Sequence, residues 1–275
     1  MHQLKIYVAL LFFVGIAAFS QTAVIDGVLK SKANNQPIAY ANIGVMGKNL
    51  GTVTDMNGKF SLLMDQNFDD SDIRISSIGY LSKTVKVLVF RKMLSESETI
   101  YLEKAVSELK EIIIKNKKLE TAILGNTLGK KTVSAGFVNN VLGNEIGIKI
   151  KINKKPTFIE AFQAMVDYNK FETLKFRVNI YDLKKGMPDQ HILTENIIVT
   201  SQVKKGLMTI DLSEYNIMVT EDFFVSIELI EQLGVGGLHF LADYDGSPII
   251  TRATSQGQWN KQGKLSFGFS VLVKE

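Results

Sequence analysis

The chain has 275 residues, of which 45% are hydrophobic and 22% are charged, so it is a globular protein of one large or two small domains and not a disordered chain. It contains no cysteine, which excludes disulfides, thiolate metal sites and the lipid-bearing cysteine of a bacterial lipoprotein. The net charge of +4 is small and scattered, which argues against a nucleic-acid partner.

The first 20 residues have the pattern of a cleavable signal peptide. Lys5 precedes an apolar run over residues 6–19, and small side chains stand where a signal peptidase reads the chain. Cleavage is predicted between Ser20 and Gln21. The run is shorter than the roughly 20 apolar residues that a retained anchor needs, and no later segment reaches that length. We therefore expect an exported protein, periplasmic or at the outer membrane or cell surface, without a transmembrane helix in the mature chain.

Residues 21–103 alternate short apolar runs with turn signals, at the spacing typical of a β-sandwich. Residues 52–54 and 59–62 are predicted to pair as a hairpin across residues 55–58. In that turn Asp55 can accept backbone N–H groups and Gly58 can adopt a positive φ. The alternation of Val85, Val87 and Val89 predicts a further strand.

Five short motifs stand out in this region. They are Gln36-Pro37-Ile38, Ala41-Asn42-Ile43, Gly51-Thr52-Val53-Thr54-Asp55, Asn57-Gly58-Lys59-Phe60 and Ile78-Gly79-Tyr80. Together they resemble the carboxypeptidase regulatory-like domain of exported Bacteroidetes-type proteins. The resemblance implies a seven-stranded, prealbumin-like sandwich that serves as an accessory module, for example ahead of TonB-dependent receptors.

The segment after this module is similar to the one that joins it to the plug of such a receptor. A receptor barrel of about 22 strands, each of about 10 residues, needs about 220 residues. Only about 160 residues follow Lys115, so we expect the plug and the barrel to be absent. Residues 104–144, rich in Gly, Asn and Lys, are predicted to be a linker or the irregular start of a second domain.

Residues 145–275 show strong alternation again. Ile146 and Ile148 share a face opposite Lys149, and Phe176 and Val178 share a face opposite residues 175, 177 and 179, so these strands are predicted to be half buried. About nine such strands predict a second, jelly-roll-like β-sandwich, and an all-β fold class for the whole protein. A membrane barrel would show the same alternation, but the aromatic residues are dispersed and form no girdles, which favours the sandwich.

No constellation of residues supports catalysis. Beyond the leader only His191 and His239 remain, and there is no His-Glu-x-x-His, Gly-x-Ser-x-Gly or phosphate-loop motif. Asp243 and Asp245 could act as a pair only if they faced a cleft, and with Gly246 they are more simply a turn. We expect no catalytic residue, no metal and no cofactor.

Two aromatic residues are the candidates for ligand contact. Trp259, the single tryptophan, stands in a polar loop, and Tyr244 stands in the turn beside Asp245. An exposed aromatic ring can stack on a sugar or mark a partner surface, although a lone Trp also serves as an anchor at the edge of a core. The sequence thus predicts a non-catalytic envelope or cell-surface accessory protein that binds an envelope protein, with a glycan-binding module as the alternative.

Overall fold

The computed structural model describes residues 22–105, 119–128, 133–137 and 140–275. The predicted signal peptide and its cleavage site at Ser20 and Gln21 lie outside these residues. Within the described ranges the protein is built mostly of β-strands, with a single α-helix, α1 (Val87–Glu96), and two 3-10 helices, η1 (Gln66–Phe68) and η2 (Ser213–Tyr215). The all-β fold class is confirmed. Over these ranges, no helix has the length and apolar character needed to span a membrane.

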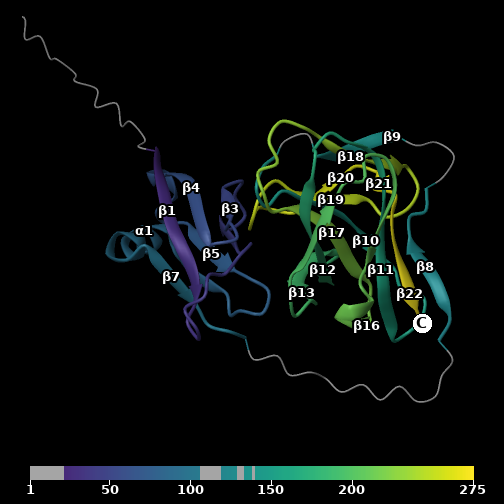
Figure 1. The fold of residues 1–275 in the computed structure, drawn as a ribbon, viewed down its shortest axis with the longest axis horizontal. Helices are drawn as coiled ribbons and strands as arrows, with labels where there is room; N and C mark the ends of the chain where they lie inside the picture. The colour runs from purple at the N-terminus through teal and green to yellow at the C-terminus, as the bar shows by residue number, and fades with distance from the viewer. Residues whose placement is uncertain (1–21, 106–118, 129–132, 138–139) are drawn as a thin grey trace, which may run out of the picture.

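Two small sheets form the first domain, on the left in Figure 1. One has the strand order β4 (Lys59–Asp65), β1 (Thr22–Ser31), β7 (Thr99–Leu102), and the other has the order β3 (Gly51–Val53), β2 (Asn42–Val45), β5 (Asp72–Ser76), β6 (Lys83–Lys86). A shared apolar core lies between them, in which Leu29 of β1 and Ile43 of β2 are fully buried. Each strand therefore has one face toward this core, as the alternation in the sequence predicts.

The turn at residues 55–58 forms as predicted, but the hairpin does not. Oδ1 of Asp55 accepts the backbone N–H groups of Asn57 and Lys59, both at 2.8 Å, and Gly58 has φ +71°. The strands on either side enter different sheets, since β3 pairs with β2 and β4 pairs with β1. The turn therefore carries the chain from one layer of the sandwich to the other.

The strand predicted through Val85, Val87 and Val89 is wrong beyond residue 86. β6 ends at Lys86 and α1 begins at Val87. Val87 and Phe90, three residues apart, are the buried residues of the helix, and both enter the core of the first domain. A helical turn places residues at this spacing on one face, so burial of Phe90 decides against the alternating strand.

The second domain, on the right in Figure 1, consists of two larger sheets. The seven-stranded sheet contains β13 (Met187–His191), β12 (Leu174–Lys184), β17 (Phe223–Leu229), β10 (Glu145–Ile150), β19 (Ile249–Arg252) and β20 (Asn260–Gln262) in that order, with β14 (Ile197–Ser201) also paired to β12. The eight-stranded sheet contains β21 (Ser266–Phe267), β18 (Leu238–Asp243), β11 (Thr157–Asn169), β22 (Phe269–Lys274) and β8 (Thr121–Gly125) in that order, with β15 (Gly206–Asp211), β16 (Ile217–Val219) and β9 (Val133–Phe137) paired alongside. The largest apolar core of the described chain lies between these two sheets.

Residues 104–144 are not irregular throughout, contrary to expectation. They contain β8, which pairs with β22, and β9, which pairs with β18. Both strands are only five residues long, and β8 is the last strand at one edge of its sheet. Such strands depend on pairing with distant parts of the chain more than on their own alternation. Their partners begin about 100 residues or more further along the sequence.

The two domains lie against each other through one sheet of each. The four-stranded sheet of the first domain faces the seven-stranded sheet of the second. Asn42 on β2 donates to Glu228 and accepts from Arg177, and Ser76 on β5 accepts from Gln256. Arg177 and Asn179 of β12 point toward the first domain and are only 1% and 0% exposed. The expectation that β12 is buried on one face only is therefore wrong, because the first domain covers its polar face.

Candidate functional site

Four charged residues lie directly opposite one another on four neighbouring strands of the seven-stranded sheet. Arg177 on β12 faces Glu228 on β17, Glu228 faces Glu145 on β10, and Glu145 faces Arg252 on β19. Their side chains are 1%, 0%, 0% and 8% exposed in that order. We call these four residues the buried ion cluster. It lies at the contact between the two domains, where Arg177 and Glu228 bond to Tyr40 and Asn42 of the first domain.

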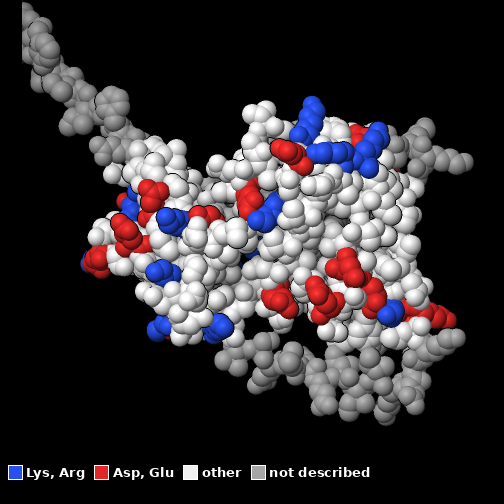
Figure 2. Space-filling view, in the orientation of Figure 1, with Lys and Arg blue, Asp and Glu red and all other residues white. Residues whose placement is uncertain are grey.

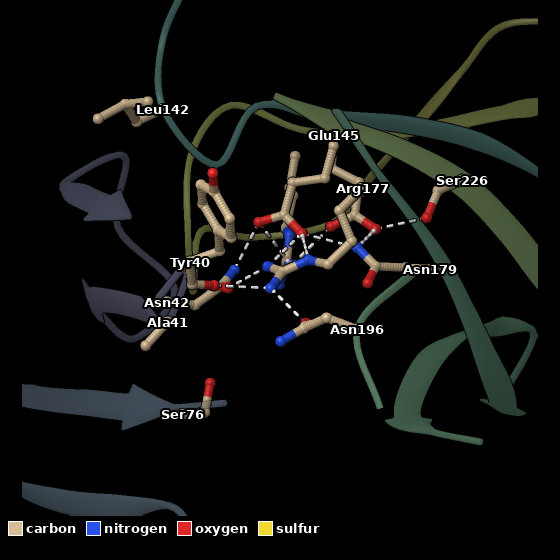
Figure 3. Close-up of polar contacts among 12 residues, drawn as sticks. Tyr40, Ala41, Asn42, Ser76, Leu142, Glu145, Arg177, Asn179, Asn196 and Ser226 are labelled. Carbon is tan, nitrogen blue, oxygen red and sulfur yellow. Dashed lines mark hydrogen bonds and ion pairs between the residues drawn. The ribbon is translucent and has the colours of Figure 1, made fainter. Parts of the chain in front are cut away.

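Arg177 uses all the hydrogen-bond donors of its guanidinium group. Nε and Nη2 donate to Oε2 of Glu228 at 3.0 and 2.7 Å. Nη1 donates to the backbone oxygen of Tyr40 at 2.7 Å and to Oδ1 of Asn196 at 3.0 Å, and Nη2 also donates to Oδ1 of Asn42. Tyr40 and Asn42 belong to the first domain, so Arg177 binds the two domains together (Figure 3).

The two carboxylates of the cluster are also fully bonded. Glu228 accepts hydrogen bonds from Nδ2 of Asn42 and Nδ2 of Asn179, both at 2.6 Å. Nη2 of Arg252 lies 2.6 Å from Oε2 of Glu145 and 3.9 Å from Oε1 of Glu228. Glu145 accepts further hydrogen bonds from Asn179 at 2.9 Å, from Tyr181 at 3.2 Å and from Ser226. The two arginines of the second domain thus compensate the negative charges, as buried charges require, and Asn42 of the first domain adds a hydrogen bond.

The pKa values of the two carboxyl groups shift in opposite directions. Burial raises the pKa of Glu228, but the guanidinium groups of Arg177 and Arg252 outweigh burial and lower it to about 2. Burial also raises the pKa of Glu145, and there the attraction of Arg252 does not compensate, because the charge of Glu228 adds to the rise.

Two carboxyl groups with diverging pKa values are typical of acid–base catalysis, but the geometry here favours a structural role. A catalytic carboxyl group must reach a proton on a substrate, and both side chains are fully buried beneath the first domain. Their oxygens already accept hydrogen bonds from fixed neighbours. The cluster is therefore suited to fixing the orientation of the two domains.

Two glycines allow the domains to approach closely. Gly44 on β2 and Gly51 on β3 are cross-strand partners. The carbonyl oxygen of Ser255, from the second domain, lies 2.1 Å from where a Cβ of Gly44 would stand and 2.3 Å from that of Gly51. A side chain at either position would push Ser255 and the second domain away.

Gly51→Ala should lower the free energy of unfolding by about 1–3 kcal/mol, the usual cost of inserting a methyl group into a closely packed contact. Urea denaturation measures this change. Gly237→Ala is the matched control, since nothing lies closer than 3.5 Å to its added Cβ. If the two variants unfold at the same urea concentration, the close contact at Ser255 does not contribute to stability.

The structure places the two predicted contact residues in different surroundings. Trp259, partly buried, lies beside the buried ion cluster, with the guanidinium carbon of Arg252 4.7 Å from the centroid of its ring and with Phe224 edge-on at 5.3 Å. Tyr244 is 63% exposed in the turn after β18. Trp259 thus has the setting of an anchor at the edge of a core, and ligand contact by either residue stays a prediction.

The aspartate pair considered in the sequence forms a turn. Oδ1 of Asp243 accepts the backbone N–H of Asp245 at 3.1 Å and a hydrogen bond from Nδ2 of Asn126 at 2.9 Å. Asp243 is 2% exposed, so it faces no cleft. In the described part of the chain, no three His, Asp or Glu side chains gather as metal ligands would.

Sequence reasoning missed the buried ion cluster, although one signal was present. Glu228 and Ser226 are the polar residues within the otherwise apolar residues 223–230. Because apolar residues occupy both faces of such a strand, its carboxylate is buried whichever face it lies on. A buried carboxylate requires a cationic partner nearby. Which cation it would meet depends on strand order, which the sequence alone does not give.

Comparison with known proteins concerns the first domain. The CarboxypepD_reg-like domain family matches residues 25–114, which confirms the resemblance found in the motifs. Over 94 residues the chain is 31% identical to the TonB-dependent receptor SusC of Bacteroides thetaiotaomicron. This alignment covers 34% of the chain and 9% of the receptor, so the chain spans only a small part of the length of that relative.

Proposed function

We propose that the protein is a non-catalytic accessory protein of the bacterial envelope, exported by its signal peptide, which binds another envelope protein through its two domains together. The observation that carries the proposal is the buried ion cluster, which joins a domain similar to part of a TonB-dependent receptor to a second β-sandwich. A fixed joint of this kind presents one continuous surface to a partner, which two domains on a flexible linker would not do.

The buried charged groups already bond to one another and to neighbouring side chains, which supports a non-catalytic role. CarboxypepD_reg-like domains are themselves non-catalytic. In the second domain, the two fully buried carboxylates of the cluster contact arginine, asparagine, serine and tyrosine side chains of this chain. On the face drawn in Figure 2, Lys and Arg side chains lie in several separate groups, several of them beside Asp and Glu side chains. This distribution suits a protein partner better than a nucleic acid, which favours a continuous basic surface.

Affinity capture from the envelope fraction of the producing cell tests the proposal. Tagged full-length protein should enrich at least one envelope protein, identified by mass spectrometry, over a mock preparation. Gly51→Ala, which disturbs the joint between the domains, should reduce that enrichment, whereas Gly237→Ala should not. If no envelope protein is enriched, or if enrichment is independent of the joint, the proposed two-domain recognition is wrong.

Glycan binding is the alternative, and the exposure of Tyr244 is the observation that favours it. The turn that contains Tyr244 continues into residues 246–248, which border a hollow of about 570 Å³ on the second domain. Aromatic rings beside a polar hollow are a common setting for a sugar. A glycan array should then show binding by the wild type that Tyr244→Ala loses, and an array without signal would remove this alternative.

A further inference from the structure

A groove of about 900 Å³ lies between β4 of the first domain and residues 230–232 of the second. β4 contributes Lys59 and Ser61 to its lining, and the turn before β4 contributes Met56. All three residues are exposed, so a ligand can reach them. Ligand sites usually enclose about 300–1,000 Å³, so the groove is large enough to hold a peptide segment.

β4 is the last strand of its sheet, and the middle of its outer edge is open. Among the described strands it pairs with β1 alone. The N–H of Leu29 on β1 donates to the carbonyl of Gly58 at 2.8 Å, and this bond fixes which residues of the ladder face each other through hydrogen bonds. By that alternation, the backbone groups of Ser61 and Leu63 point away from β1. Proteins usually protect such an edge with a charge or a proline, which these two residues lack, so the edge is suited to pairing with another strand.

Exposed apolar side chains lie beside this edge. Val24 of β1 and Leu63 of β4 are cross-strand partners, and both are more than half exposed. Met56, in the turn before β4, is also more than half exposed. Methionine adapts its shape to different partners and is common at surfaces that bind peptides. A strand added to β4 would cover part of this apolar surface, which stabilises a complex.

The charges of the groove favour a basic segment. Glu231 lies 2.8 Å from Nζ of Lys175, so this pair is neutral. The other charged residues of the lining, all exposed, are Asp26, Asp55, Glu98 and Lys59. None of these four forms an ion pair with a described residue, so three carboxylates and one lysine leave the groove a net charge of −2. Lysine or arginine side chains of a bound segment would compensate this charge.

We propose that an extended, basic segment of the partner envelope protein binds in this groove as an additional strand on β4. Its main chain bonds to Ser61 and Leu63. Its cationic side chains, at every second position of the strand, lie on the face that carries Asp26, the cross-strand partner of Ser61. The inference rests on the proposed function, since it names the part of the partner that the two domains contact together.

An NMR titration of the full-length protein with the peptide acetyl-Lys-Val-Lys-Val-Lys-Val-amide tests the site. One counterpart carries glutamate in place of lysine, and the other is the lysine peptide N-methylated at every residue, which keeps the charges but cannot donate backbone hydrogen bonds. We expect saturable shifts of the amide signals of Ser61 and Leu63 with the lysine peptide, and binding of both counterparts weaker by about tenfold or more. Equal binding of the lysine peptide and either counterpart, or no saturation by the lysine peptide, overturns the proposal.

Two variants and a control test the role of the charges. The double variant Asp26→Asn, Glu98→Gln should bind the lysine peptide about tenfold more weakly, because two exposed charge contacts are lost. Lys59→Gln should strengthen binding by about threefold, because a repelling cation leaves the groove, and misfolding could not produce that gain. Asp70→Asn removes an exposed carboxylate of the first domain outside the groove and should leave affinity within about twofold. Equal affinity of the wild type and both groove variants would disprove the role assigned to these charges.

Capture from the envelope fraction separates this inference from the proposed function. The double variant Asp26→Asn, Glu98→Gln should enrich less of the envelope partner than the wild type. If the partner is captured in amounts that depend on Gly51 but not on these two carboxylates, two-domain recognition stands and the added strand on β4 is wrong. If nothing is captured while the lysine peptide saturates β4, the proposed function is wrong and the groove remains a site for an extended basic segment.

Discussion

Replacing Arg177 by methionine should lower the free energy of unfolding by about 3–5 kcal/mol, the cost of leaving a buried charge without its partner. Methionine keeps the unbranched stem of arginine but carries neither the charge nor the donors. Glu228 would lose the two close contacts with Arg177, at 3.0 and 2.7 Å, and keep only Arg252, at 3.9 Å. The carbonyl of Tyr40 would lose the donor that reaches it from the second domain. Urea denaturation followed by the fluorescence of Trp259, the single tryptophan, measures the change.

An exposed ion pair supplies the control for this prediction. Lys32 lies 2.6 Å from Glu103, with side chains 65% and 57% exposed. Lys32→Met should leave the denaturation midpoint nearly unchanged, because pairs in water contribute little to stability. If Arg177→Met and Lys32→Met behave alike, the buried ion cluster does not hold the two domains together.

Glu228→Gln should cost about 3 kcal/mol of stability at pH 7, and this cost should shrink as the pH falls. The folded protein lowers the pKa of Glu228 from 4.5 to about 2, and each unit is worth about 1.4 kcal/mol. A carboxyl group with a lowered pKa stabilises the fold at pH values above its unfolded pKa. That contribution disappears as the pH falls from about 4.5 toward about 2, where the folded protein also takes up the proton.

Urea denaturation of wild type and variant at pH 7, 5, 4 and 3 measures how the difference in their free energies of unfolding shrinks as the pH falls. By pH 3 the difference should be less than half of its value at pH 7. Glu160→Gln removes a carboxylate that is 25% exposed and pairs with Lys274, and it controls for the loss of one negative charge. If the free energy of unfolding of the wild type exceeds that of Glu228→Gln by the same amount at every pH, the charge of Glu228 contributes no stability.

Local patterns in the sequence predicted the elements that are stabilised mainly by their own alternation. β10 and β12 lie where apolar residues recur at every second position, and the turn at residues 55–58 carries the Asp and Gly that its geometry requires. The motifs likewise identified the family of the first domain. In each case the physical signal lies within about ten consecutive residues.

The elements that the sequence did not predict depend on distant contacts. Val87 and Val89 alternate as a strand would, but Phe90 reaches the core only if the chain turns into α1. β8 and β9 form because strands more than 100 residues away offer them free edges. The periodicity of a short segment does not reveal the burial of Phe90 or the pairing of β8 and β9, because both depend on residues that come close only in the folded protein.

The sequence by itself determined the all-β class and the alternating strands, because these follow from the spacing of side chains along one strand. Its short motifs determined the family of the first domain. Only the tertiary structure decided that the polar face of β12 is buried. The sequence pattern predicts that Arg177 and Asn179 face solvent, but the four-stranded sheet covers them. Glu145, Glu228 and Arg252 become partners only because their strands are neighbours in the sheet. Charges far apart in sequence can compensate one another in a low dielectric only after strand pairing and domain docking have brought them together.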